Sequence, residues 1–253
     1  MLIQNGLSMF EKHCNKQKFA ILKIVMNTKK YSLIGVQTSS CFDAGVAFGT
    51  SYSYKNACQV CGTGAEQVSE LRIPLSKAPS GEIACSWFGH IIVQRPLFLD
   101  LLKSGLDEKD TRRVEWKKPV TTEWFQLLPR FVLPPMDRSS RGFKKSDDPT
   151  ERSCPVCRRD GNWGDPSSSQ VIVLSRARLA ERISDVARIN PNTIKQNICI
   201  FFTWECMAKS LPGNSIPPRL LAFPMIVIND VLLDVFVEHC GKKFVYDSVE
   251  FVD

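Results

Sequence analysis

Two Cys-x-x-Cys motifs place the strongest constraint on how this chain folds. One spans Cys58–Cys61 (CQVC) and the other Cys154–Cys157 (CPVC). Such a turn presents two thiolates to one tetrahedral metal ion, and two turns together supply the four sulfur ligands of a closed structural zinc site. The sequence therefore predicts that Cys58, Cys61, Cys154 and Cys157 bind one structural Zn²⁺ ion.

The long interval between the two motifs leaves other interpretations open. A compact zinc ribbon has roughly 15 to 20 residues between its cysteine pairs, and here Cys61 and Cys154 are much further apart. A shared site requires the fold to bring these distant segments together. The alternatives are two reduced, buried pairs, or two redox-active dithiols of the thioredoxin type, which need a βαβ setting.

Composition indicates a soluble globular protein. Of 253 residues, 43% are hydrophobic and 23% charged, and this length can bury one large core or two smaller ones. The apolar runs are too short for a membrane span, and Lys23 interrupts the one near the N-terminus, so we expect a cytoplasmic protein with reduced cysteines and no membrane partner. The net charge of +7 leaves a nucleic-acid or acidic-protein partner open.

The expected organisation has four parts. Residues 134–152 combine prolines and charges with few apolar side chains, which is typical of an exposed segment. Residues 1–26 are expected to be an extension with Met26 as an alternative start, although residues 19–25 are apolar enough for a strand. The predicted parts are the extension (1–26), a first half with the first motif (27–133), an exposed linker (134–152), and a second half with the second motif and an insertion near 168–206 (153–253).

Local patterns predict strands and helices in both halves. In the first half we expect strands at 31–36 and 82–93, a helix from Pro96 to the cap at Gly105, a strand at 114–116, a helix at 124–128 and a strand at 131–133. Cys85 and His90 are expected to be packing residues of the 82–93 strand. In the second half we expect strands at 171–174, 197–204, 225–228, 244–246 and 249–252, and helices at 176–189 and from the Asn229 cap to Gly241.

An internal repeat connects the halves. Residues 91–102 and 225–236 align without a gap, and a Val-Glu-aromatic segment follows each, at 114–116 and 249–251. The identical pairs are Ile92 with Ile226, Val93 with Val227, Leu99 with Leu233 and Asp100 with Asp234. We therefore predict an α+β fold of two related strand–helix–strand halves joined around a zinc-knuckle, zinc-ribbon-like site.

Motifs of the common enzyme classes are absent from the sequence. It contains no Gly-x-Ser-x-Gly, His-Glu-x-x-His, phosphate-binding loop or dinucleotide fingerprint. The chain is therefore not expected to be an enzyme.

Two Cys-x-x-Cys knuckles, each ahead of a strand–helix–strand unit ending in Val-Glu-aromatic, resemble the bacterial double-CXXCG motif family. The resemblance covers about residues 27–253 apart from the suggested insertion, and departs from the pattern at Arg158, where the second motif would have glycine. It implies a non-catalytic immunity protein that binds and neutralises a cognate toxin. The alternative is a zinc-ribbon nucleic-acid-binding protein that uses Arg176, Arg178, Arg182 and Arg188 on phosphates.

Overall fold

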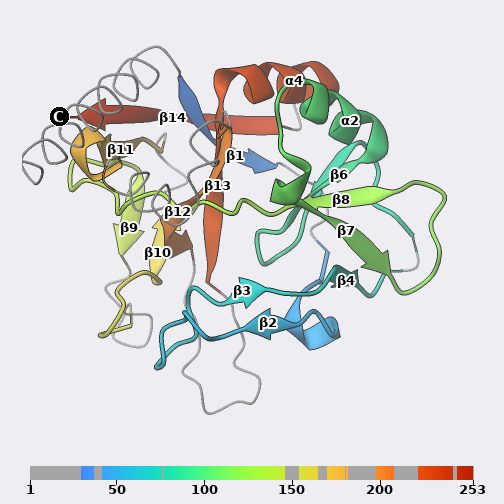
Figure 1. Ribbon diagram of the computed structural model, residues 1–253, viewed down its shortest axis with the longest axis horizontal. Helices are drawn as coiled ribbons and strands as arrows, with labels where there is room; N and C mark the ends of the chain where they lie inside the picture. Colours follow the sequence, from blue (N-terminus) through green and yellow to red (C-terminus); the bar gives the residue numbers. More distant parts are fainter. Residues whose placement is uncertain are drawn as a thin grey trace, which may run out of the picture.

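The chain folds into a mixed α+β structure with two five-stranded sheets (Figure 1). None of the described helices is long and apolar enough to cross a membrane. The computed structural model describes residues 30–36, 42–75, 77–145, 154–164, 170–179, 181, 198–207, 222–241 and 244–252.

The first sheet, here called the β8 sheet, has the strand order β4-β7-β8-β6-β5. Only β4 and β7 run parallel, and the other neighbours are antiparallel. Helix α2 follows β6 directly. The elements are β4 (Leu71–Ile73), β5 (Ile83–Cys85), β6 (Ile91–Gln94), α2 (Arg95–Lys103), η2 (Glu108–Asp110), β7 (Thr111–Trp116) and β8 (Trp124–Leu127).

The second sheet, the β1 sheet, has the order β11-β14-β1-β13-β12 and the same sequence of strand directions. Only β11 and β14 are parallel, and α4 follows β13 directly. The elements are β1 (Tyr31–Val36), β11 (Ile172–Ser175), β12 (Ile200–Met207), β13 (Phe223–Asn229), α4 (Asp230–Cys240) and β14 (Phe244–Val252).

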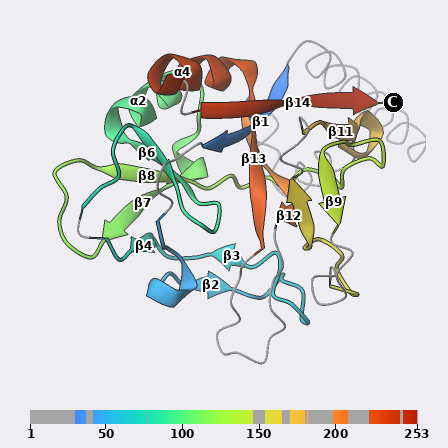
Figure 2. The same cartoon turned by 180° about the vertical axis from the view of Figure 1, so that it is seen from behind.

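Two short antiparallel ribbons complete the fold, and each encloses one Cys-x-x-Cys motif. The first ribbon pairs β2 (Tyr52–Ser53) with β3 (Glu66–Gln67), and the second pairs β9 (Phe143–Lys145) with β10 (Asn162–Gly164). Figure 2 shows β2 and β3 at the end of the molecule opposite α2 and α4. A 3-10 turn, η1 (Val46–Phe48), precedes β2.

From β1 to β7, and again from β8 to β14, the chain repeats one order of elements. We call residues 30–116 the first unit and residues 124–252 the second unit. Each has an initial strand, a parallel bridge (Phe42 to Ser86, or Val132 to Phe202), a cysteine ribbon, three strands, a helix and a last strand. The initial strands are exchanged: β1 lies between β13 and β14 of the second unit, and β8 lies between β6 and β7 of the first.

One hydrophobic core joins the two sheets beneath α2 and α4, which lie side by side (Figure 1). Side chains alternate between faces along each strand, so Ile226 and Ile228 of β13 enter this shared core whereas Val227 packs on the outer face of the β1 sheet. In β6, Ile91 and Val93 enter it and Ile92 faces outward. The units therefore share one core.

A cluster of three ionisable side chains also connects the two units. His239 near the end of α4 lies with Nδ1 2.6 Å from Glu82 Oε2 and Nε2 3.1 Å from Asp100 Oδ2. Burial lowers the pKa of His239, but the hydrogen bond and charge of Glu82, with those of Asp100, outweigh burial and raise it above its usual value. When the imidazole is protonated, both of its N–H groups can donate to carboxylates of the first unit.

Most of the predicted elements are confirmed, including strand 31–36 and the helices α2 and α4. The single strand predicted at 82–93 is wrong, because this stretch forms the two antiparallel strands β5 and β6 joined by a turn. Pro96 lies in the first turn of α2, and Gly105 has a positive φ of 102° just after it. Asn229 Oδ1 accepts the Leu232 N–H (3.0 Å) and caps α4. The helix predicted at 176–189 begins at Arg176 as expected, and beyond Leu179 only Glu181 lies inside the described residues.

The helix predicted at 124–128 is wrong, because Trp124–Leu127 is the central strand β8. Trp124 packs on the outer face of the β8 sheet, and Phe125 and Leu127 enter the shared core. A strand covered on both faces has a continuous apolar run, which periodicity does not distinguish from a buried helix. The strand predicted at 131–133 is reduced to the Val132 bridge.

Residues 134–145 of the predicted linker pair with β11 through their backbone, while Arg138, Ser139 and Arg141 are exposed. The Asp137 N–H donates to Val173 O (2.7 Å), and Arg141 and Val171 exchange both backbone hydrogen bonds, so this segment covers the free edge of β11. Composition does not reveal this pairing, because it counts apolar side chains and not backbone hydrogen bonds. The rest of the predicted linker, 146–152, lies outside the described residues, as does the predicted extension, 1–26.

The two units share one order of elements, and their strand register differs by one residue from the predicted alignment. Gln94 and Asn229 each precede a helix, and each lies opposite an aromatic residue of the exchanged strand, Trp124 and Tyr31 respectively. Gln94 and Asn229 therefore occupy equivalent positions in the two units. The ungapped sequence alignment instead matches Gln94 with Ile228. The region 168–206, predicted as an insertion, includes strands that have counterparts in the first unit. It contains β11 and β12, which occupy the positions of β4 and β5, and the longer intervals fall after each of these two strands.

Candidate metal centre

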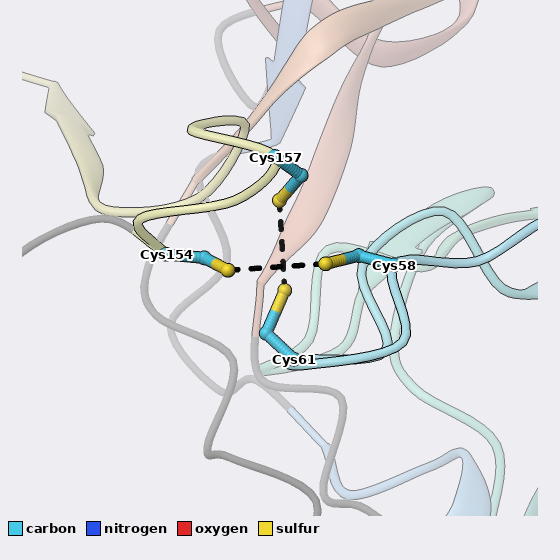
Figure 3. A group of neighbouring side chains, drawn as sticks. All are labelled: Cys58, Cys61, Cys154 and Cys157. Carbon is cyan, nitrogen blue, oxygen red and sulfur yellow. Dashed lines mark hydrogen bonds between the residues drawn. The ribbon is translucent and has the colours of Figure 1, made fainter.

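The four cysteines predicted from sequence lie together in one cluster. Their Sγ atoms are all within 4.8 Å of one another, and the side chains from the two ribbons point toward a common centre (Figure 3). Cys58 Sγ lies 3.8 Å from Cys154 Sγ, and Cys61 Sγ lies 3.6 Å from Cys157 Sγ. Four sulfurs bound tetrahedrally at about 2.3 Å from one ion are about 3.8 Å apart. The cluster, which forms no disulfide, could hold a metal ion.

The first knuckle is a tight turn closed by its own backbone. The Gly62 N–H donates to Cys58 O (2.8 Å), and the Cys58 N–H donates to Thr63 O (3.0 Å). Gly62 has a φ of 76°, a left-handed conformation that glycine adopts without steric cost. Thr63 Oγ1 lies 3.2 Å from Cys61 Sγ, so its hydroxyl can donate to a thiolate there.

The second knuckle repeats this turn without the glycine. The Arg158 N–H donates to Cys154 O (3.0 Å), and Arg158 has a φ of 54°, the only positive φ of a non-glycine residue in the described part of the chain. The departure from the family pattern at this position therefore leaves the turn unchanged. It puts a side chain in a conformation that costs roughly 1 to 2 kcal/mol.

Replacing Arg158 by glycine is expected to stabilise the protein by up to about 1 kcal/mol. Relief of the left-handed strain exceeds the extra chain entropy that glycine gives the unfolded state. Urea unfolding of the metal-loaded chain measures the change. The matched control is Gly62→Ala in the first knuckle, which should destabilise by about 1 kcal/mol, and a loss of stability in Arg158→Gly would show that the arginine makes a needed contact.

Polar groups of the second knuckle hold it against β12 and the first knuckle. The carboxylate of Asp160, which is fully buried, accepts the Cys154 N–H (2.7 Å). Arg159 donates from Nε to Trp204 O (2.8 Å), and its guanidinium lies 5.1 Å from the centre of the Trp204 ring. A Cβ at Gly64 would lie 2.5 Å from Arg159 Nη1, so Arg159 also reaches the loop after the first knuckle.

Burial and hydrogen bonding oppose each other in the thiol pKa values. Burial raises the pKa of Cys157 to about 11 and raises that of Cys61 further. Burial also opposes ionisation of Cys58, but backbone N–H groups of Cys61 and Val60 lower its pKa to about 7. Four thiolates in such a cluster repel one another, and a bound cation would remove that penalty and release the protons.

Neither Cys85 nor His90 joins the cluster. Cys85 is a strand residue packed against the shared core, as predicted, but His90 lies in the turn between β5 and β6 and not in a strand. Cys85 ends β5, and His90 lies between Ser86 and Tyr52.

Sequence reasoning did not associate Cys206 with the site. Its thiol is buried, which raises its pKa to about 12, and the charge of Cys61 adds to that shift. No spacing signal links Cys206 to either motif.

The arrangement disfavours the thioredoxin-type alternative. In thioredoxin-like sites a helix N-terminus lowers the pKa of the attacking thiol, whereas both motifs here lie in turns between strands.

No family profile, curated protein or solved structure matches this chain. The geometry of the site must therefore support any functional conclusion.

Proposed function

We propose that the four cysteines bind one structural zinc ion and that the protein acts by binding a partner rather than by catalysis. The observation that carries the proposal is the convergence of four Sγ atoms from two knuckles 96 residues apart. All-sulfur tetrahedral coordination is typical of structural zinc. Four protein ligands leave no coordination position for substrate or water.

In this proposal the two units are zinc-knuckle halves descended from one duplicated unit. Three observations support it: the same order of strand directions in both sheets, the exchange of β1 and β8, and one knuckle inside each ribbon. The metal would then bind one pair of thiolates from each half, so its binding free energy would stabilise their association.

The partner that we propose is a toxin, in keeping with the resemblance to the double-CXXCG family. Several arginines form ion pairs, which reduces their availability for phosphates and favours a protein partner over nucleic acid. These pairs are Arg72–Glu115, Arg95–Glu123, Arg113–Glu123, Arg141–Glu250, and Arg130 with Asp107 and Asp110. Of the four arginines considered for phosphates, Arg182 and Arg188 lie outside the described residues.

An exposed tryptophan supports a protein interface. Trp87, in the turn between β5 and β6, is 65% exposed, and tryptophan is enriched among the residues that dominate binding energy in interfaces. Its backbone N–H donates to Phe42 O (3.1 Å), so the turn that presents the ring is held in place.

Co-expression tests the proposal. The chain should restore growth of cells producing the toxin domain encoded beside its gene and should co-purify with that domain. Trp87→Ala should weaken the complex at least tenfold, whereas Tyr246→Ala, which removes another exposed aromatic ring (53%) on β14, should not. The proposal fails if the pair does not associate and the chain instead binds duplex DNA with a steep salt dependence.

A further inference from the structure

A cavity of about 1110 Å³ opens beside the knuckles, between the two units. Its wall includes the segment after Phe42, the β5–β6 turn, the end of β8, and the facing ends of β12 and β13. The volume is slightly above the usual range for small-molecule sites, which are mostly apolar with a few directed polar groups.

A chain of hydrogen bonds fixes one of these polar groups. Ser86 Oγ accepts the N–H groups of Phe88 (3.2 Å) and His90 (3.0 Å), so its own proton goes to His90 Nδ1 (2.8 Å). Burial lowers the pKa of His90 to about 4, and the neutral ring then carries its proton on Nε2. That proton is donated to Tyr52 Oη (3.1 Å).

Tyr52 is therefore left as a donor in the cavity wall. Its oxygen accepts from His90, burial raises its pKa so that the hydroxyl stays protonated, and among the described residues no acceptor is found for the hydroxyl proton. A ligand that offers an acceptor oxygen would satisfy it.

Arg112 of β7 provides a charge in the same cavity wall. Its Nη1 donates to Gln67 O and Ser69 O (both 3.0 Å), and Gln67 lies directly opposite Tyr52 in the β2–β3 ribbon. Arg112 is half-buried, and no carboxylate in the described part of the chain pairs with it. Its Nε and Nη2 groups are thus available for a bidentate bond to an oxyanion.

The other charges of the wall are exposed or already engaged. Arg130 pairs with Asp107 and Asp110 outside the cavity wall. Glu66, Asp43 and Lys109 are exposed. Arg159 is half-buried, but it donates from Nε to Trp204 O and lies over the Trp204 ring. The half-buried donors Tyr52 and Arg112 therefore decide which charge the interior prefers.

Aromatic side chains form much of the remaining wall. Phe48, Phe88, Trp204 and Phe223 all line the cavity and are half-buried. Phe223 packs directly on Gly89, where a Cβ would lie 2.0 Å from the ring. Flat apolar ligands gain both buried area and ring contacts on such surfaces.

We infer that this cavity binds an amphipathic organic anion, with an aromatic body against Phe88, Trp204 and Phe223 and a carboxylate, sulfonate or phosphate group bonded to Arg112 and Tyr52. The inference does not depend on the proposed toxin partner. The metal enters only by keeping the two units of the wall together.

Two matched fluorescent probes test it on the full metal-loaded chain. The first is 8-anilinonaphthalene-1-sulfonate, an aromatic monoanion, and the second is N-phenyl-1-naphthylamine, which has the same body without the sulfonate. We expect saturable one-to-one binding of the anion and roughly 10- to 100-fold weaker binding of the neutral probe, the range for loss of a hydrogen bond to a charged group.

Three variants assign the binding to this cavity. Arg112→Gln should lower the affinity for the anionic probe to that for the neutral probe, without changing the affinity for the neutral probe. Tyr52→Phe should lower the affinity for the anionic probe severalfold, and it keeps the test decisive if Arg112→Gln does not fold. Arg113→Gln is the control, because the neighbouring side chain is 73% exposed and pairs with Glu123. Equal affinity for both probes, non-saturable binding, or equal losses in Arg112→Gln and Arg113→Gln would overturn the inference.

Discussion

Replacing Cys157 by serine, or removing the metal with a chelator, is expected to destabilise both units in one cooperative transition. Each unit supplies two of the four thiolates, and the units share the core under α2 and α4. A ligand present at a thousand times its Kd stabilises the folded state by about 4 kcal/mol, so we expect a loss of at least that size. Chemical unfolding with and without chelator measures it.

Hydrogen exchange shows whether the loss is shared. Amides of β6 and β8 report on the first sheet, and those of β12 and β13 on the second. Cys85→Ser is the control, because this half-buried cysteine lies outside the cluster and should leave metal content and cooperativity unchanged. Loss of protection in the second sheet alone would contradict a shared metal.

A chain cut between β7 and β8 is expected to remain one folded particle, even without metal. The first fragment carries β1, which lies in the centre of the second sheet, and the other carries β8, which lies in the centre of the first. Separating the fragments would remove both central strands and expose the shared core, at a cost of many kcal/mol. A protease site inserted after Lys118, in the exposed β7–β8 connection, allows the cut.

Gel filtration of the cut chain in chelator tests the exchange. We expect the two fragments to elute together at the mass of the intact chain until denaturant is added. Adding Ile34→Asp, which places a carboxylate on β1 in the shared core (Ile34 is 5% exposed), should separate them because a buried unpaired charge is very costly. Fragments that separate without denaturant and without this substitution would contradict the exchanged arrangement.

Sequence patterns identified the features that depend on neighbouring residues. Pro96 and Gly105 bound α2, Asn229 caps α4, and the cysteine spacing selected the four residues that the fold brings together. Each of these signals has a local physical cause: a fixed φ, a side-chain acceptor for a free N–H, or two thiolates on one turn.

Features that depend on long-range pairing were beyond such patterns. Nothing in Tyr31–Val36 or Trp124–Leu127 specifies which sheet the strand enters, because pairing depends on partners distant in the chain. The one-residue error in the repeat has the same origin. Identical side chains favoured an alignment of Leu99 with Leu233. The strand register instead makes Gln94 and Asn229 equivalent, because each precedes a helix and lies opposite an aromatic residue, Trp124 or Tyr31.

The zinc content of the purified chain tests the central claim most directly. Protein prepared without added metal should contain one zinc ion per chain by elemental analysis, and the ion should be lost when Cys58 and Cys154 are both replaced by serine. Its four cluster thiols should react with a thiol reagent only after chelation. A preparation with no zinc and four freely reactive thiols at these positions would contradict the account.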